Sequence, residues 1–214
     1  MRKKPSAQGV TFLNKKSCHI DKTVTFGKNV VVQSGNVITG KTHISDNIIL
    51  KPNNIIHNCQ IDENCVIEQS NLSDSIIGKN CQIGPFARLR PNSKIEDNCK
   101  IGNFVEIKNS QIGKGTKASH LAYIGDANIG ENCNIGCGVI FANYNGRGKN
   151  KITVGNNCFI GSNSNLIAPI TVADNTYICA DTTLTKDTNE YDFVIARTRE
   201  TIKPERAKKY LKEN

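Results

Sequence analysis

The stretch IIGKNCQIGPFARLRPNSKIEDNCKIGNFVEIKNS (residues 76–110) carries a branched aliphatic residue at every sixth position. These aliphatic positions are Ile77, Ile83, Leu89, Ile95, Ile101 and Ile107. A period of six fits neither an α-helix, which repeats every 3.6 residues, nor a single alternating strand. It fits a short strand and a turn, repeated around a three-sided coil whose circuit takes about 18 residues.

The same period runs through most of the chain, from Ile20 to Leu50 and again from Val154 to Leu184, with one-residue slips between. Successive circuits of such a coil stack as parallel strands about 4.8 Å apart. The aliphatic residue fills the inside, and a small residue four positions later also points inward. The glycine that often follows the aliphatic residue is expected to supply positive φ at a corner. The sequence therefore predicts an all-β, parallel solenoid.

The nine cysteines are explained by the same repeat. Seven of them occupy the small inward position: Cys18, Cys59, Cys65, Cys81, Cys99, Cys133 and Cys158. Buried free thiols behave as small apolar residues, and no CxxC pair suggests a metal site. We therefore predict no metal, and free thiols indicate a reducing, cytoplasmic location.

The net charge of +9 lies at the two ends of the chain. Residues 1–16 hold five bases and no acid, and residues 197–214 are also basic. We expect a basic N-terminal arm over 1–16, the coil over 17–196, and a basic tail over 197–214 with a short helix near Pro204. A protein that binds nucleic acid would carry a basic stripe on its folded body, so no nucleic-acid partner is predicted. The start MRKKPSAQ lacks an apolar run, and neither a signal peptide nor a membrane span is expected.

Residues one circuit apart should lie above one another, and this brings polar side chains together. Arg90 stacks with Lys108, two cations that repel each other unless an anion lies near them, which favours a phosphate site over two solvated side chains. The outward-facing His120 should lie between Asn103 and Cys137. The spacing predicts one edge of the prism that gathers Arg88, Arg90, Glu106, Lys108, His120 and Tyr123.

The segment FANYNGRGKNK (141–151) does not follow the period of six. It is expected to be a loop that leaves the coil, with Asn143 and Tyr144 at its base and Lys149 on it. Loops on rigid scaffolds commonly carry function, although a tolerated surface insertion would give the same pattern.

The motifs GPFARLRP (84–91) and KASHLAYIGD (117–126) resemble the acetyltransferase half of the bacterial bifunctional N-acetylglucosamine-1-phosphate uridylyltransferase/glucosamine-1-phosphate acetyltransferases, over about residues 9–200. The resemblance implies a left-handed parallel β-helix that forms homotrimers with active sites between subunits. It also implies acetyl transfer from acetyl-CoA to the amine of glucosamine 1-phosphate, within UDP-N-acetylglucosamine and cell-envelope precursor synthesis.

The resemblance also implies roles for individual residues. His120 would be the general base. From its place in the column, apart from the resemblance, we expect Glu106 to orient the cluster or His120 itself. The sugar phosphate would be held by residues of the edge, the next circuit and the loop: Arg90, Lys108, Tyr123, Asn134, Asn143, Tyr144 and Lys149. The acetyl-CoA channel would be lined by Cys137, Asn143, Tyr144, Ser162, Ala180 and Arg197.

The sequence departs from the family in several places. The family's N-terminal nucleotidyltransferase domain is not in this chain, so we expect no uridylyl transfer here and a separate uridylyltransferase as partner. Ser119, Cys137, Asn150 and Asp181 stand where the family usually has other residues, and the last two bear on acetyl-CoA affinity.

Three other interpretations stay open on sequence alone. The chain could be an acyltransferase of the same fold with another acceptor, such as serine, a plain sugar or an amino-sugar nucleotide. Cys137 and His120 share a column and could form a nucleophile pair. A non-catalytic trimeric scaffold that docks through its basic ends is the third. A metal-dependent hydratase is disfavoured because His120 is the only histidine on these circuits.

Overall fold

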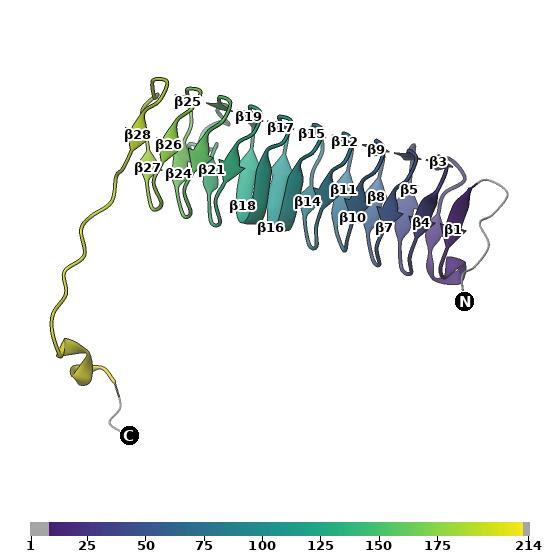
Figure 1. Cartoon of the computed structure of the whole chain (residues 1–214), viewed down its shortest axis with the longest axis horizontal. Helices are drawn as coiled ribbons and strands as arrows, with labels where there is room; N and C mark the ends of the chain where they lie inside the picture. Colours follow the sequence, from purple (N-terminus) through teal and green to yellow (C-terminus); the bar gives the residue numbers. More distant parts are fainter. Residues whose placement is uncertain (1–8, 212–214) are drawn as a thin grey trace.

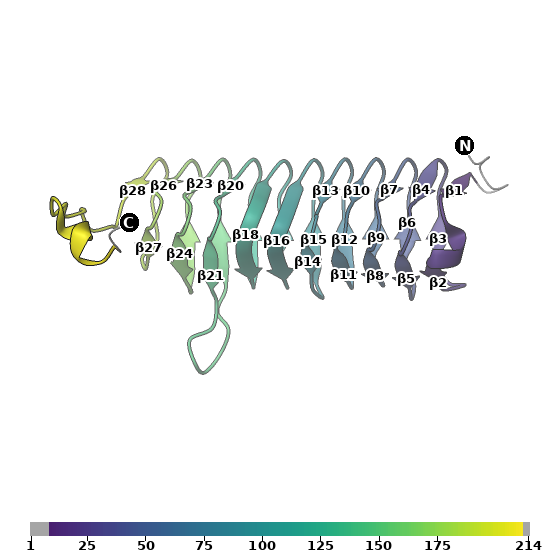
Figure 2. The same cartoon turned by 90° about the horizontal axis from the view of Figure 1, so that it is seen from below.

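The computed structural model describes residues 9–211, which form one long parallel β-helix followed by an extended tail (Figures 1 and 2). Each circuit of the coil crosses three flat faces, which we call walls 1, 2 and 3 in chain order. Corner 1 joins walls 1 and 2, corner 2 joins walls 2 and 3, and corner 3 returns the chain to wall 1. One such circuit is called a rung, and successive rungs stack along the coil. The prediction of an all-β solenoid is confirmed.

Walls 1 and 2 belong to one 19-stranded sheet, because β16 (Lys100–Lys108) and β18 (Lys117–Gly125) run continuously around corner 1. The other strands of wall 1 are β1 (Val10–Phe12), β4 (Val30–Val32), β7 (Ile49–Leu50), β10 (Val66–Ile67), β13 (Gln82–Ile83), β20 (Asn134–Ile135), β23 (Phe159–Ile160), β26 (Tyr177–Ile178) and β28 (Phe193–Val194). The other strands of wall 2 are β2 (His19–Ile20), β5 (Val37–Thr39), β8 (Ile55–His57), β11 (Asn71–Ser73), β14 (Arg88–Leu89), β21 (Ile140–Ala142), β24 (Asn165–Ile167) and β27 (Thr183–Leu184).

Wall 3 is a separate sheet of nine strands. Its strands are β3 (Thr25–Phe26), β6 (His43–Ile44), β9 (Gln60–Ile61), β12 (Ser75–Ile77), β15 (Ser93–Ile95), β17 (Gln111–Ile112), β19 (Ala127–Ile129), β22 (Ile152–Val154) and β25 (Ile170–Val172). Two single-turn 3₁₀ helices lie outside the walls, η1 (Lys15–Ser17) and η2 (Arg206–Lys209). The second is the short helix expected after Pro204.

The core is a set of vertical stacks in which one aliphatic side chain lies on the next. Along wall 3, for example, Ile77, Ile95, Ile112 and Ile129 are in register and buried. Burial of branched aliphatic side chains against one another is the main source of stability here. Each rung contacts only its neighbours, as in other solenoids.

The cysteines largely follow the prediction. Six of the seven at the small inward position are buried, while Cys18 is half-buried. Burial raises the pKa of the Cys59 thiol to about 11, so that it stays protonated at neutral pH. Of the two cysteines outside that position, Cys179 is buried and Cys137 is exposed.

Corner geometry corrects one expectation, because asparagine rather than glycine supplies most of the positive φ values. At corner 3 they lie between 55° and 62° at Asn29, Asn47, Asn64, Asn80, Asn98, Asn132, Asn157 and Asn175. Asparagine tolerates this left-handed conformation better than most residues. The glycine after the aliphatic residue is needed for space: a Cβ on Gly102 would lie 1.9 Å from the carbonyl oxygen of Ser119.

The ends of the coil also differ from the sequence-based boundaries. Strand β1 pairs with β4, so the coil starts within the segment expected to be a separate arm over 1–16. The first eight residues of that arm lie outside the described residues. After β28 the chain leaves the coil, and the described tail extends away from it (Figure 1). Among the described residues, no helix is long and apolar enough to cross a membrane.

Candidate active site

The first group of site residues lies where wall 2 meets corner 2. Arg88 and Leu89 are in register with Glu106 and Ile107, which places Arg90 directly below Lys108. The next position in this column is Gly125. A Cβ there would lie 2.5 Å from the Tyr123 hydroxyl and 2.7 Å from the Asn143 amide nitrogen. The glycine therefore leaves room for the Tyr123 hydroxyl and the Asn143 side chain directly above the two cations.

The predicted loop leaves the coil beside this column (Figure 2), but it starts at Asn143, because Phe141 and Ala142 belong to strand β21. Asn143, at its base, is buried, and its amide donates a hydrogen bond to the Asp126 carboxylate. Tyr144 and Lys149 form an antiparallel bridge that closes the loop. The loop brings the Lys149 ammonium next to Lys108, and the side-chain contact with Lys108, together with its like charge, lowers the pKa of Lys149.

Three cations thus approach one another at corner 2. Arg90 has a carboxylate partner, whereas Lys108 and Lys149 form no salt bridge in the described part of the chain. An ammonium group whose pKa is lowered by a neighbouring ammonium group is the electrostatic signature of an anion site. The arrangement suits a phosphate group, which accepts several charged hydrogen bonds at once.

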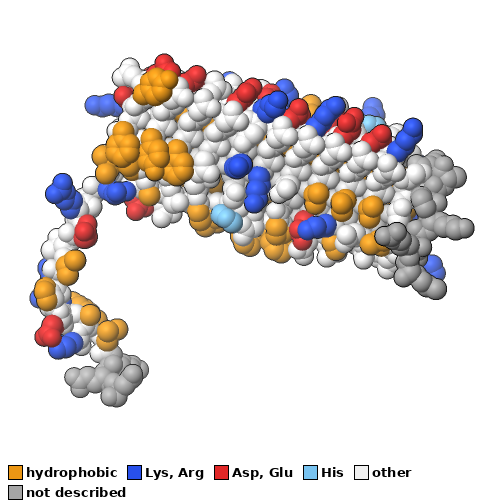
Figure 3. All heavy atoms as spheres, viewed as in Figure 1, with side chains coloured by type: hydrophobic (Ala, Val, Ile, Leu, Met, Phe, Trp, Pro, Cys, Tyr) orange, Lys and Arg blue, Asp and Glu red, His pale blue; other side chains and the backbone are white. Residues whose placement is uncertain are grey.

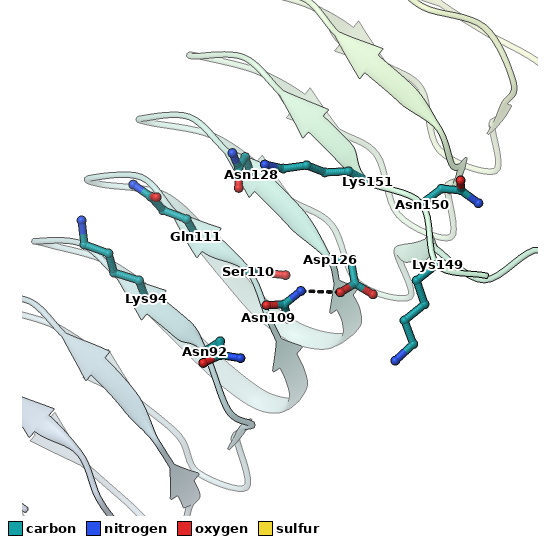
Figure 4. A pocket seen from close by; sticks show the side chains of 10 residues that line it. All are labelled: Asn92, Lys94, Asn109, Ser110, Gln111, Asp126, Asn128, Lys149, Asn150 and Lys151. Carbon is teal, nitrogen blue, oxygen red and sulfur yellow. Dashed lines mark hydrogen bonds between the residues drawn. The ribbon is translucent and has the colours of Figure 1, made fainter.

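A hollow of about 450 Å³ adjoins this group on the wall 3 side (Figure 4). It shares Lys149 with the cation group, and it also includes Asp126, the partner of Asn143. Asn109 lies at its floor and donates a hydrogen bond of 2.6 Å to the Asp126 carboxylate. Lys94, Gln111 and further amide side chains line the rest, so the hollow is polar throughout.

Glu106 contacts Arg90 and not His120. Its Oε1 lies 2.8 Å from Nη1 of Arg90, and both side chains are about one-third exposed. The carboxylate therefore holds the guanidinium of Arg90.

His120 lies at corner 1, in the column expected for it. Its Nδ1 is 2.7 Å from Oδ1 of Asn103, one rung below, and the ring is exposed. The contact fixes the tautomer, because Nδ1 must carry the proton to donate to the amide oxygen. In the neutral ring Nε2 then carries the free lone pair.

The prediction of a single edge is wrong in one respect. The six residues span the whole of wall 2, because β16 and β18 bend at corner 1 through Phe104 and Leu121. His120 lies at one side of the wall and Lys108 at the other. Lys108 lies four residues beyond the bend, about 13 Å along the wall at about 3.3 Å per residue.

A column of small side chains rises from His120 along corner 1. Ser162 lies above Cys137 and Ala180 lies above Ser162, as the registers of β20, β23 and β26 require. At its upper end, the Arg197 guanidinium donates a hydrogen bond of 3.1 Å to the Ala180 carbonyl oxygen. Four of the six residues expected to line an acetyl-CoA channel are therefore contiguous, whereas Asn143 and Tyr144 lie on the loop at corner 2.

The side chains of two further predicted residues point away from both groups, although the Tyr144 backbone pairs with that of Lys149. Asn134 is on wall 1, in register with Lys117 and Phe159, so corner 1 separates it from Tyr123. Tyr144 is 62% exposed, and its hydroxyl donates to the Gly146 carbonyl oxygen within the loop.

Sequence reasoning missed three residues at corner 1. Phe86, Phe104 and Leu121 have positive φ values of 59°, 58° and 37°, and about half of each side chain is exposed. The Phe86 and Phe104 rings stack with centroids 5.5 Å apart. The sequence carried a signal for them, because the two phenylalanines lie 18 residues apart at positions where most other circuits have glycine, asparagine, glutamine or aspartate.

Comparison with known proteins first defines a class. The bacterial transferase hexapeptide repeat matches residues 74–109 and 151–186, and the solenoid is a left-handed β-helix of such repeats. An Arabidopsis UDP-N-acetylglucosamine acyltransferase structure matches 84% of this chain and 69% of its own, with a TM-score of 0.54 and 18% identity, which supports the fold alone.

Particular relatives are much closer in sequence. The chain is 48% identical over 205 residues to the bifunctional protein GlmU of Clostridium novyi (strain NT), covering 95% of this chain and 45% of that protein. Against GlmU of Clostridioides difficile (strain 630) the identity is 46%, covering 91% and 42%. The chain thus spans a little under half the length of the curated relatives it matches.

Proposed function

We propose that this chain transfers the acetyl group of acetyl-CoA to the amine of glucosamine 1-phosphate, which yields N-acetylglucosamine 1-phosphate for UDP-N-acetylglucosamine and peptidoglycan synthesis in the cytoplasm. The observation that carries the proposal is the approach of Lys149 to Lys108 above Arg90. This group of cations calls for an anionic acceptor. Close similarity to GlmU supports the same assignment.

In this proposal His120 accepts the proton of the attacking amine through Nε2, while Asn103 holds the ring. The nitrogen forms a bond to the thioester carbonyl carbon, and the carbon–sulfur bond breaks to release the CoA thiolate. The proton taken by His120 then passes to that thiolate. Histidine is suited to this exchange because its unperturbed pKa of about 6.5 lies near neutrality.

The acceptor site is proposed to be shared between copies of the chain. The amine and the phosphate of glucosamine 1-phosphate are on adjacent carbons of one ring, whereas wall 2 separates His120 from Lys108. One copy would therefore supply Arg90, Lys108 and Lys149, and the next would supply His120 and Asn134. A homotrimer in which corner 1 of one copy meets corner 2 of the next would achieve this, and the contact would cover the exposed side chains of Phe86, Phe104 and Leu121.

Acetyl-CoA would lie along the small-residue column above His120. The side chains of Cys137, Ser162 and Ala180 are short enough to let an extended arm approach the backbone, and Arg197 offers a guanidinium to phosphate at the upper end. The thioester would then be close to His120.

A thiol-release assay tests the proposal. Purified protein is incubated with acetyl-CoA and either glucosamine 1-phosphate, glucosamine or serine, and free CoA is measured. We expect rapid release with glucosamine 1-phosphate alone. Release with another acceptor would indicate a different acyltransferase, and no release with any would favour a scaffold. In the same assay, loss of activity in Cys137→Ala would favour the Cys137–His120 nucleophile pair.

A further inference from the structure

Three aromatic rings form a ladder on the outer face of wall 1. Phe159, Tyr177 and Phe193 are in register on consecutive rungs. Their centroids are 4.6 Å and 5.3 Å apart, and the planes are within 12° of parallel. An apolar patch lies at this end of the coil, where the tail departs (Figure 3).

The ladder interrupts a polar column. Directly below it on the same wall, the outward positions are Lys100, Lys117 and Asn134. Ring exposure rises along the ladder, from 38% at Phe159 and 43% at Tyr177 to 66% at Phe193. The cause is geometric: the two lower rings cover each other, while β28 is the last strand of this wall in the described residues. Phe193 therefore presents one free aromatic face, held flat by the rings behind it.

The ladder runs beside the small-residue column. Ser162 follows Phe159 by three residues around the start of corner 1, and Ala180 follows Tyr177 in the same way. From His120 to Ala180 the column climbs three rungs, roughly 14 Å at about 4.8 Å per rung. Phe193 and Arg197 lie on the rung beyond. A flat apolar face and a guanidinium thus lie together at the end of the column opposite His120.

We propose that the Phe193 ring, backed by Tyr177 and Phe159, stacks on the adenine of CoA while Arg197 meets its phosphates. Adenine is flat and aromatic, and base stacking on such side chains needs no sequence-specific hydrogen bond. The order of chemical groups in CoA matches the order of features here: thioester, extended arm, phosphates, adenine. The inference rests on the proposed use of acetyl-CoA and adds the part of the donor that this wall recognises.

A truncated donor separates this role from a structural one. Phe193→Ala is compared with the unaltered protein using acetyl-CoA and S-acetylpantetheine, which lacks the adenine and phosphates. We expect the ratio of kcat/KM for acetyl-CoA to that for S-acetylpantetheine to fall about tenfold in Phe193→Ala, and Phe193→Tyr to restore it. If both donors are affected equally, the ladder packs between copies or supports the coil, and the proposal is wrong.

Direct binding gives a second test that does not depend on the acceptor. The chain has no tryptophan, so Phe193→Trp introduces a single tryptophan at the proposed stacking face, and its emission can be excited apart from that of the tyrosines. CoA should quench its emission and pantetheine should not, while Phe26→Trp at the far end of the coil serves as the matched control. Calorimetry with CoA separates the proposed donor from the proposed stacking. If the unaltered protein does not bind CoA, the proposed use of acetyl-CoA is wrong. If Phe193→Ala binds CoA as tightly as the unaltered protein, only the stacking is wrong.

Discussion

Corner 3 and corner 1 turn the chain in the same way but with different residues. At corner 3 asparagines stack on asparagines, and the Asn80 amide donates to Asn98 Oδ1 at 3.2 Å. Corner 1 begins and ends similarly, with positive φ at Asn53 on an early rung and Asn163 on a late one. Only its middle rungs carry large apolar side chains.

The difference shows where the molecule departs from what its own fold favours. A left-handed conformation costs roughly 1–2 kcal/mol for a residue with a bulky side chain, and exposing an aromatic ring adds to this cost. Phe86 and Phe104 bear both costs beside Asn103 and His120. Because this backbone strain lies next to a candidate site, we infer that the two phenylalanines contact another copy of the chain.

The largest effect is expected at His120. His120→Ala should lower acetyl transfer by about 10²–10⁴-fold, because the amine loses its proton acceptor, while the exposed position leaves the coil intact. Steady-state turnover measures the activity, and circular dichroism checks that the coil is intact. His57→Ala is the matched control, since His57 is also exposed on wall 2 and bonds to Thr39 at 2.9 Å. If His120→Ala turns over at nearly the unaltered rate, His120 is not the general base.

Lys108 should be the next most sensitive position. Lys108→Ala is expected to raise the KM for glucosamine 1-phosphate about 10- to 100-fold, as removal of a charged hydrogen bond does, and to leave the KM for acetyl-CoA nearly unchanged. Lys100→Ala, in the same strand but on wall 1, is the control. Equal increases in both KM values would argue against a phosphate role.

Phe104→Asn converts corner 1 into the pattern of corner 3. We expect the isolated coil to gain about 1 kcal/mol, since asparagine suits the left-handed conformation, while assembly and activity fall about tenfold at micromolar protein. Light scattering, urea unfolding and turnover report the three quantities. The reverse change, Asn98→Phe, should weaken the coil without affecting assembly. If the Phe104→Asn protein assembles and turns over normally, Phe104 has no role in assembly.

The smallest expected effect is a pH dependence of acceptor binding. Lys108 lowers the pKa of Lys149 in the free protein, and a bound phosphate would raise it again. Binding then takes up a proton between the two pKa values, so affinity should fall a few-fold as the pH rises through the lower one. Calorimetry in buffers of different ionisation enthalpy measures the proton. Lys149→Arg should abolish the dependence, because arginine stays charged; an unchanged profile would contradict it.

Much of the site was accessible from spacing. The interval of 18 residues placed Arg90 under Lys108, and the slip-corrected interval placed His120 over Asn103. The contact between Lys149 and Lys108 could not be predicted from spacing, because it depends on the path of an irregular loop. The pairing of Glu106 with Arg90 depends on side-chain rotamers, which a repeat period does not specify.

The amino-acid pattern alone determined the coil, its interior and the vertical neighbours of each side chain, because a period of six has one regular solution that buries every aliphatic residue. Only the tertiary structure decided how far apart the columns lie around the circuit. The bend of β16 and β18 at corner 1 separates His120 from the cations, and the position of that bend follows from which residues adopt left-handed φ. That choice is a property of packing between rungs.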